Sequence, residues 1–309
     1  MTTALYTHDD CDGHVTPMGH PEQVARVQRI RARLAGPEFA ALDRRDCPLG
    51  SDTQIALCHP QSYIDGIVAA EPLTGTRALD ADTHMSPGSV AAARRAVGGA
   101  VAAVDAVLAG EVRNAFVAAR PPGHHAETAL VMGFCLFGNV AIAAKHAMTV
   151  HGLTRVAVVD FDVHHGNGTQ DLLWNEARAL FFSSHQMPLW PGTGDPSDRG
   201  AHGQVHNIPL PPQSGGAEMR AAYAARVFPV IDAFAPELIL ISAGFDAHAA
   251  DPLAELNWQT GDFIWLTQQV CALAAKHCEG RVVSVLEGGY DLDALADSAA
   301  AHVQALMAG

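Results

Sequence analysis

The stretch that decides the fold is Val156-Ala157-Val158-Val159-Asp160-Phe161-Asp162-Val163-His164-His165-Gly166-Asn167-Gly168-Thr169. It begins as an apolar, β-branched run and then changes abruptly to carboxylates, imidazoles and glycines. Such a run is typical of a strand that is buried on both faces of a parallel sheet. The polar residues would then lie at the carboxyl end of this strand, and their composition indicates a metal site.

The rest of the chain alternates between short apolar runs and longer helical patterns. This alternation predicts an α/β fold with three layers (α/β/α), in which helices cover both faces of a mostly parallel sheet. We expect the region from 186 to 214 to be irregular, and residues 9–17 to form a loop. Further strands are expected at 4–7, 114–119, 179–183, 238–243 and 282–286, and helices at 21–35, 53–71, 88–108, 139–151, 169–175, 217–234, 260–277 and after Tyr290.

Length and composition favour one domain over residues 1–309, because a single sheet of this type can organise a chain of 309 residues. The apolar stretches are too short to span a bilayer. The first residues show no secretory pattern, so the expected location is the cytoplasm. Six cysteines without C-x-x-C spacing are expected to be reduced thiols.

The formal net charge is −14, and no Lys/Arg stripe reverses it. This balance disfavours direct nucleic-acid binding and suits a cationic or amine partner. No membrane partner is expected.

Several polar clusters follow predicted strands, which is where open α/β sheets bind ligands. Asp162 and His164 are two residues apart in an extended segment, so their side chains point to the same side. Asp246 follows another buried strand and can complete a set of three ligands. One imidazole and two carboxylates suit a divalent ion such as Zn²⁺. Each residue alone could be a helix cap or a core histidine, but the combination favours a metal site.

The adjacent residues His124 and His125 follow Pro121-Pro122-Gly123, which can form the tight turn that points both rings into one pocket. They offer a base for an attacking water and an acid for a leaving amine. Asp160 and Asn167 are candidate acceptors that would orient these imidazoles.

Tyr290 follows two glycines after a predicted strand, so its phenol could donate a hydrogen bond to an oxyanion. Phe134 and Trp190 lie in glycine-flanked loops and could line a narrow apolar channel. Taken alone, either aromatic residue is more often part of ordinary packing.

These motifs together resemble the zinc-dependent histone deacetylases of class II and their bacterial relatives, the histone deacetylase-like amidohydrolases. The resemblance spans almost the whole chain. The motifs that carry it are Arg120 to Ala126 (RPPGHHA), Gly133 to Cys135 (GFC), Asp160 to Gly168 (DFDVHHGNG), Pro191 to Gly194 (PGTG), Ala243 to Asp246 (AGFD) and Glu287 to Tyr290 (EGGY).

The resemblance implies an arginase/deacetylase-like fold with an eight-stranded parallel sheet and hydrolysis of an acetylated amine such as acetyl-lysine. It also implies a potassium ion beneath the zinc. The roles that it implies are zinc ligation by Asp162, His164 and Asp246, catalysis by His124, His125 and Tyr290 with Asp160 and Asn167 in support, a substrate tunnel at Gly133, Phe134, Trp190 and Gly288, and potassium binding by Asp160, Asp162, His164, Ser183 and Ser184.

The sequence departs from the family pattern at two positions. Trp190 stands where many members have Phe, which could narrow the tunnel or fit it to another acyl group. Asn167 stands where class I enzymes have Asp, as in class II enzymes, which would make His125 less basic.

Three functions are compatible with these residues. The first is a zinc amidohydrolase acting on acetyl-lysine, an acetylpolyamine or a small amide. The second is a dinuclear manganese ureohydrolase on the same scaffold, which would need further carboxylates to bridge two ions. The third is an inactive module that binds acylated amines, and the presence of both histidines and the tyrosine argues against it.

Overall fold

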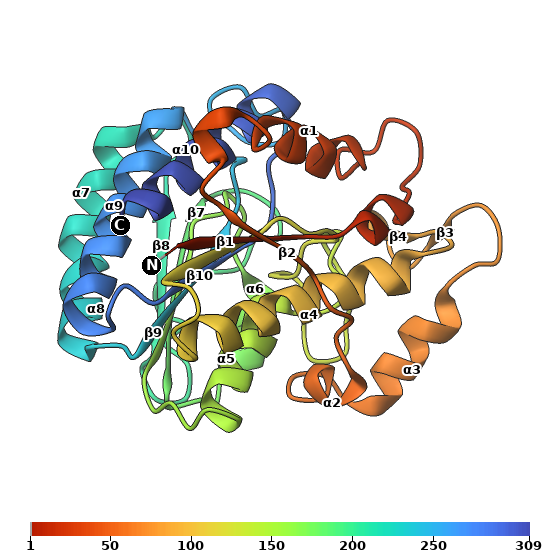
Figure 1. The fold of residues 1–309 in the computed structure, drawn as a ribbon, viewed down its shortest axis with the longest axis horizontal. Helices are drawn as coiled ribbons and strands as arrows, with labels where there is room; N and C mark the ends of the chain where they lie inside the picture. The colour runs from red at the N-terminus through yellow and green to blue at the C-terminus, as the bar shows by residue number, and fades with distance from the viewer. Residues whose placement is uncertain (1) are drawn as a thin grey trace.

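Eight parallel strands form one sheet at the centre of the molecule (Figure 1). The structure is a computed structural model that describes residues 2–309. The strands follow the spatial order β2-β1-β5-β10-β9-β6-β7-β8, so the chain begins near one edge and crosses to the other. Their bounds are β1 Thr3–Thr7, β2 Asp43–Asp46, β5 Asn114–Val117, β6 Val156–Asp160, β7 Ala179–Gln186, β8 Val205–Leu210, β9 Leu238–Ala243 and β10 Val282–Leu286.

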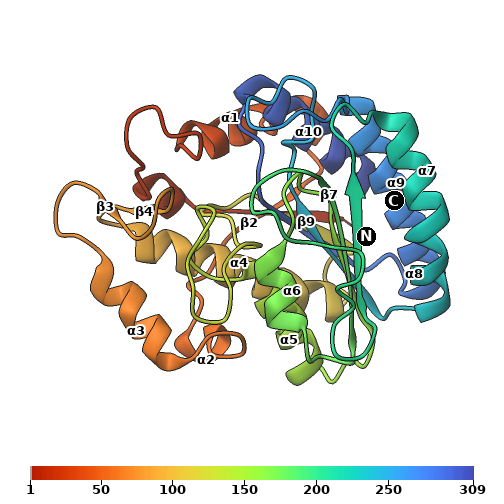
Figure 2. The ribbon, with the colours of Figure 1, turned by 180° about the vertical axis from the view of Figure 1, so that it is seen from behind.

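Helices cover both faces of the sheet, as the sequence predicts. One face carries α4 (Ser89–Leu108), α5 (Asn139–Thr149) and α6 (Asn167–Leu173). The other carries α1 (Ala25–Arg33), α7 (Gly216–Arg226), α8 (Phe228–Phe234), α9 (Thr260–His277) and α10 (Leu292–Ala308). Short helices α2 (Asp52–Ile55) and α3 (Gln61–Ala70) and the hairpin of β3 (Arg77–Ala78) and β4 (His84–Met85) form a lobe at one end (Figure 2).

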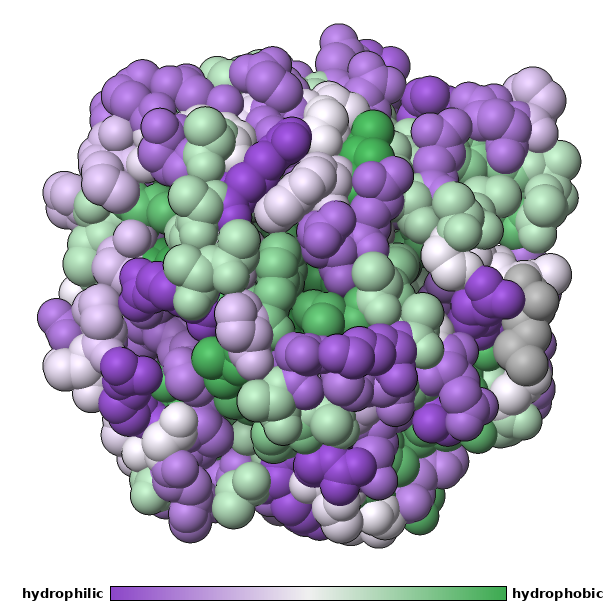
Figure 3. All heavy atoms as spheres, turned by 90° about the vertical axis from the view of Figure 1, so that its left-hand side faces the viewer, coloured by the Kyte–Doolittle hydropathy of each residue, from purple (hydrophilic) through white to green (hydrophobic). Residues whose placement is uncertain are grey.

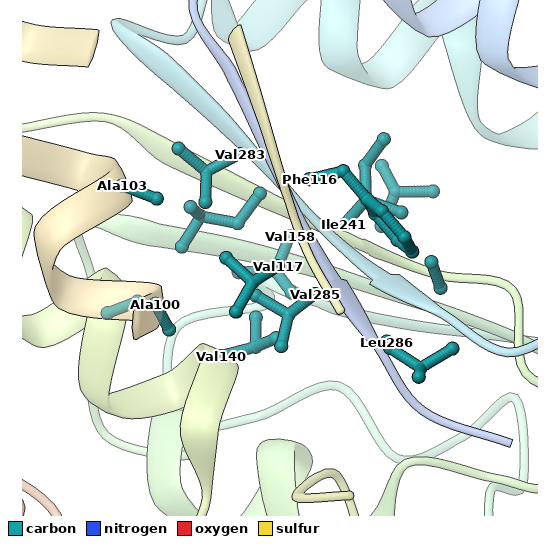
Figure 4. Close-up of a cluster of buried hydrophobic side chains, with 14 of the residues drawn as sticks. Ala100, Ala103, Phe116, Val117, Val140, Val158, Ile241, Val283, Val285 and Leu286 are labelled. Atoms are coloured by element: carbon teal, nitrogen blue, oxygen red, sulfur yellow. The ribbon is translucent and has the colours of Figure 1, made fainter. Parts of the chain in front are cut away.

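The core lies on both sides of the central strands. Val117 and Val285 face Ala100 and Ala103 of α4, whereas Phe116 lies on the opposite side of the sheet (Figure 4). These side chains are at most 1% exposed. Alternate residues of one strand therefore pack against the helices on opposite faces of the sheet. Because both faces are buried, the central strands are continuous apolar runs in the sequence.

The structure corrects the sequence interpretation in several places. The helix expected at 21–35 spans only Ala25–Arg33, and the one expected at 217–234 is divided into α7 and α8. The region 186–214 was expected to be irregular, but it contains β8, which forms the edge of the sheet beside β7. The strand β2 has no apolar pattern that would predict it, because its sequence, Asp43-Arg44-Arg45-Asp46, is entirely charged, as suits the other edge of a sheet. A short 3-10 helix, Asp9–Gly13, also stands within the expected loop at 9–17.

The molecular surface over the side of α7, α8 and α9 is a mixture of hydrophilic and hydrophobic residues, with the hydrophobic ones in small groups (Figure 3). All six cysteines are unpaired and buried, as expected for reduced thiols. Within residues 2–309, none of the helices has the length and hydropathy needed to cross a membrane.

His302 gives a testable pH dependence of stability. Its ring is fully buried between the hydroxyls of Thr267 and Ser284, at 2.6 and 2.8 Å, and burial lowers its pKa to about 3. Between an unfolded pKa near 6.5 and this folded value, the unfolded chain binds more protons than the folded one. The free energy of unfolding should therefore fall with decreasing pH by about 1.4 kcal/mol per pH unit from this group.

Urea titrations at a series of pH values between the two pKa values would measure this slope. His302→Gln keeps a hydrogen-bonding side chain that does not titrate, so its slope should be shallower than that of the wild type. Equal slopes would contradict the assignment to His302.

Candidate active site

The polar clusters converge at the carboxyl edge of the central strands. The turn after β5 carries His124 and His125, the segment after β6 carries Asp162 and His164, and the segment after β9 carries Asp246. The chain after β10 brings Gly288 and Tyr290 to the same place. This convergence was expected from the parallel sheet, since the carboxyl ends of its strands share one edge.

Asp162, His164 and Asp246 form a buried group of three candidate metal ligands, with one ligand atom from each within 4.8 Å of the others. The His164 Nδ1 lies 3.1 Å from Asp162 Oδ1 and 3.2 Å from Asp246 Oδ2. Backbone N–H groups of Gly288 and Val163 donate to the two carboxylates, at 2.8 and 2.9 Å. The three side chains are thus oriented toward one point before any ligand binds.

The electrostatics of this group favour a cation. Burial lowers the pKa of His164, but the hydrogen bonds to Asp162 and Asp246 outweigh it and raise the pKa to about 10. Burial and the Asp162 charge raise the pKa of Asp246 to about 7. Two carboxylates forced together out of water gain from a positive charge between them, and a divalent ion supplies it.

Two glycines allow the backbone to approach the carboxylates. A Cβ on Gly288 would overlap the carboxylate oxygens of Asp246 and Asp162, and one on Gly244 would overlap Asp162. Gly288 was predicted as a tunnel residue, and in the structure it lies beside the carboxylates of Asp246 and Asp162.

The rings of His124 and His125 lie 3.9 Å apart between centroids, tilted by 42° to one another, and both residues are buried. The His124 Nδ1 lies 2.9 Å from Asp160 Oδ2, and the His125 Nδ1 lies 2.7 Å from Asn167 Oδ1. The two acceptors expected from the sequence are therefore in contact with these imidazoles. Each contact fixes one ring nitrogen, so that Nε2 is left for exchange of protons.

The two imidazoles have opposite pKa shifts. For His124 burial lowers the pKa, but the charges of Asp162 and Asp160 raise it well above the usual value. For His125 burial and the neighbouring His124 and His164 lower the pKa well below it. Two neighbouring groups whose pKa values are shifted apart can serve as the acid and the base of one reaction.

A pocket of about 210 Å³ leads to this centre. Gly133, Phe134 and Trp190 line it, as predicted, and Tyr290, His125 and His164 lie along it. Trp190 is 42% exposed, and its ring is 4.8 Å from that of His125, which places it between solvent and the histidine pair. Gly133 has φ +57°, and a Cβ there would overlap His125.

Tyr290 faces the ring of Phe134 edge-on, with centroids 5.9 Å apart. Its backbone N–H donates to Asp251 Oδ2 at 2.7 Å, and the Arg26 guanidinium lies 4.9 Å from the ring centroid. Burial raises the pKa of Tyr290 well above its usual value, so the phenol keeps its proton and remains a hydrogen-bond donor.

Sequence reasoning missed several residues of the site. Glu287 is buried and accepts from the N–H groups of Gly123 and His124, at 2.6 and 3.1 Å, so it holds the histidine turn in place. It belongs to the motif that ends at Tyr290, but nothing in the sequence pairs it with the distant turn of His124. The pocket also includes three residues that carried no motif signal, Asp82, Leu189 and Leu253.

The pKa of His125 can be tested through Asn167. Glu127 accepts from Asn167 Nδ2 at 2.8 Å, so Asn167→Asp should be made together with Glu127→Gln. A carboxylate in place of the Asn167 amide would favour the imidazolium and raise the pKa of His125. If neutral His125 accepts a proton in the reaction, the acidic limb of the kcat/KM profile should move to higher pH relative to Glu127→Gln alone. An unchanged acidic limb would contradict this role.

The fold and site thus define a class of α/β protein in which two carboxylates and one imidazole, candidate metal ligands, lie beside a histidine pair. The histone deacetylase domain family matches residues 20–306, so the chain belongs to the histone deacetylase family, whose members act on amides of acylated amines.

Known relatives show how far the similarity extends. A histone deacetylase-like amidohydrolase from Pseudomonas aeruginosa is 39% identical, over 88% of this chain and 73% of that protein. The human polyamine deacetylase HDAC10 is 37% identical, over 99% of this chain and 48% of that protein. The crystal structure of the HDA15 HD domain superposes with a TM-score of 0.94 at 31% identity, covering 99% of this chain and 88% of that one. The expected arginase/deacetylase-like fold is thereby confirmed.

Proposed function

We propose that residues 1–309 form one zinc-dependent amidohydrolase domain that removes an acyl group, chiefly acetyl, from an acylated amine such as acetyl-lysine. The observation that carries this proposal is the buried group of Asp162, His164 and Asp246 at the end of a narrow pocket. Their nitrogen and oxygen donors suit zinc. When bound there, zinc would supply Lewis-acid activation of the amide carbonyl and of a water molecule.

The histidine pair would move the protons. His125, whose pKa is lowered, accepts a proton from the attacking water through the nitrogen that Asn167 leaves free. His124 keeps its proton because Asp160 accepts from its other nitrogen. The pair then returns a proton to the leaving amine.

Tyr290 would stabilise the negative charge that develops on the amide oxygen. Its phenol stays neutral and lies in the pocket with His125 and His164. Phe134 and Trp190 would hold the aliphatic chain of the substrate between them, and their rings would exclude water from it.

A potassium ion near β7 is part of the same proposal. Ser183 pairs in register with Asp160, and the Ser184 hydroxyl lies 3.5 Å from the Asp160 carbonyl oxygen. These oxygens, with those of Asp162 and His164, are hard donors of the kind that potassium uses. We expect removal of potassium to lower the hydrolytic activity without removing zinc.

Two alternatives share the site. The substrate could be an acetylpolyamine or a small amide in place of acetyl-lysine. The similarity to a polyamine deacetylase favours testing acetylpolyamines. A dinuclear manganese ureohydrolase is less favoured, because Gly166 and Asn167 occupy positions where extra carboxylates would be useful. Retention in the cytoplasm is the proposed location.

The deciding experiment is turnover on a panel of acetyl- and trifluoroacetyl-lysine peptides, acetylpolyamines and simple amides, with metal content measured in parallel. We expect hydrolysis that is lost on chelation and restored by zinc, with one zinc bound in the candidate active site. Two manganese ions there, or no amide hydrolysis by the zinc-loaded protein, would refute the proposal.

A further inference from the structure

A second group of metal-ligand side chains lies outside the candidate active site. It consists of Asp105 from α4, His146 from α5, and His151, which follows α5 directly. The Nε2 atoms of His146 and His151 lie 2.6 and 2.7 Å from the same oxygen, Asp105 Oδ1. Within residues 2–309, this group and the candidate active site are the two sets of three such side chains that could hold one ion.

The group belongs to the other edge of the sheet. Helix α4 ends at Leu108 shortly before β5 begins, and α5 ends at Thr149 shortly before β6 begins. Asp105 and His151 therefore lie near the amino ends of the strands, whereas the candidate active site lies at their carboxyl ends. An ion bound here would not contact a substrate in the pocket.

The three donors have the chemistry of a borderline metal site. Two imidazole nitrogens and one carboxylate oxygen suit first-row divalent ions such as Zn²⁺, Co²⁺ or Ni²⁺, whereas Mg²⁺ and Ca²⁺ prefer oxygen donors. Each donor comes from a side chain that can reach an ion without movement of the backbone, because all three atoms already lie within 4.8 Å of one another. The net charge of −14 favours cations in general.

One ligand of this group is buried, and the other two are partly exposed to solvent. The His146 ring is 6% exposed, and Asp105 is the one hydrogen-bond partner that its nitrogens have in the described chain, since Nδ1 has none. The side chains of His151 and Asp105 are 29% and 50% exposed. An ion could therefore enter from solvent, and water could fill the coordination positions that the protein leaves open.

We propose that Asp105, His146 and His151 bind one first-row divalent ion, with zinc as the representative case. The site links α4 to the end of α5, so the bound ion acts as a cross-link between two helices of the same layer. An ion that binds the folded but not the unfolded chain stabilises the fold by mass action.

The competing explanation is a carboxylate oxygen that accepts hydrogen bonds from both imidazoles and never binds a metal. Both arrangements place the two Nε2 atoms near Asp105 Oδ1. A metal site binds one additional ion per chain, whereas the purely hydrogen-bonded arrangement binds none. The number of ions bound per chain therefore decides between them.

The test uses the untagged full chain, dialysed to equilibrium against free Zn²⁺ and analysed for zinc per chain. Four proteins are compared: the wild type, His151→Ala, Asp105→Asn and the control His202→Ala, which removes an exposed histidine outside the group. Because the result is a difference between variants, it is independent of how many ions the candidate active site holds. Circular dichroism checks that each variant is folded.

We expect the wild type and His202→Ala to retain one equivalent of zinc more than His151→Ala and Asp105→Asn. Zinc should also raise the thermal midpoint of the first two proteins by more than that of the last two. The same zinc content in the wild type and in folded His151→Ala or Asp105→Asn would overturn the proposal, as would a second equivalent that disappears in His202→Ala.

Discussion

Replacing Tyr290 by Phe should lower kcat on an acetylated substrate by about 100- to 1,000-fold, the loss typical of removing one donor to an oxyanion. The substitution deletes a single hydroxyl and leaves the ring in contact with Phe134 and Arg26. The phenol is neutral at the working pH because burial raises its pKa well above the usual value. It can therefore donate a hydrogen bond to a developing negative charge, which the variant cannot do.

The measurement is steady-state kinetics with the zinc content of each protein determined in parallel. Zinc content should be unchanged, since the three candidate ligands do not include Tyr290. Tyr6→Phe is a matched control, because it removes a hydroxyl that donates to the Ala102 carbonyl oxygen, outside the pocket. A Tyr290→Phe variant with near wild-type kcat would remove the phenol from the proposed mechanism.

Residues of the candidate site could be predicted from the sequence where polar, reactive side chains come directly after a buried strand. Asp162 and His164 are two positions apart after β6, and Asp246 follows β9, so strand geometry alone brings them to one edge of the sheet. The contacts of His124 with Asp160 and of His125 with Asn167 could be anticipated for the same reason.

Other features depend on contacts between segments that no local pattern connects. Glu287 holds the turn of His124 across 163 positions of sequence. The strand β2 carries only charged residues, because an edge strand is covered on fewer sides than a central one. Burial and partner choice at such positions arise from tertiary packing, which hydrophobic periodicity does not encode.

The buried ion pairs of Glu22 are long-range contacts on which the free energy of unfolding should depend strongly. Its carboxylate is fully buried between two arginines, with Arg26 Nη1 at 3.1 Å and Arg120 Nε at 2.7 Å. Burial raises the pKa of Glu22, but the charge of Arg120 outweighs it, and the net pKa lies well below the usual value. The carboxylate is therefore ionised and balances guanidinium charge that has no access to solvent.

Glu22→Gln should lower the free energy of unfolding by about 3–5 kcal/mol, the cost typical of leaving buried charges without their partner. Urea unfolding would measure this loss. Asp293→Asn is the matched control, because it breaks an exposed ion pair with Arg29 and should change stability little. A loss in Glu22→Gln as small as that of the control would mean that the arginines find other partners.

Glu22→Gln should also lower kcat, because the buried ion network supports the turn that carries Tyr290. Arg26 donates to the carbonyl oxygens of Gly289 and Glu287, at 2.6 and 2.5 Å, and its guanidinium lies beside the Tyr290 ring. Without Glu22, Arg26 loses the carboxylate that fixes its position, and the turn that carries Tyr290 loses its support. At a temperature where Glu22→Gln is still folded, we therefore expect kcat to fall in this variant and to stay near the wild-type value in Asp293→Asn. A folded Glu22→Gln with unchanged kcat would show that the turn holds Tyr290 without help from the buried ion network.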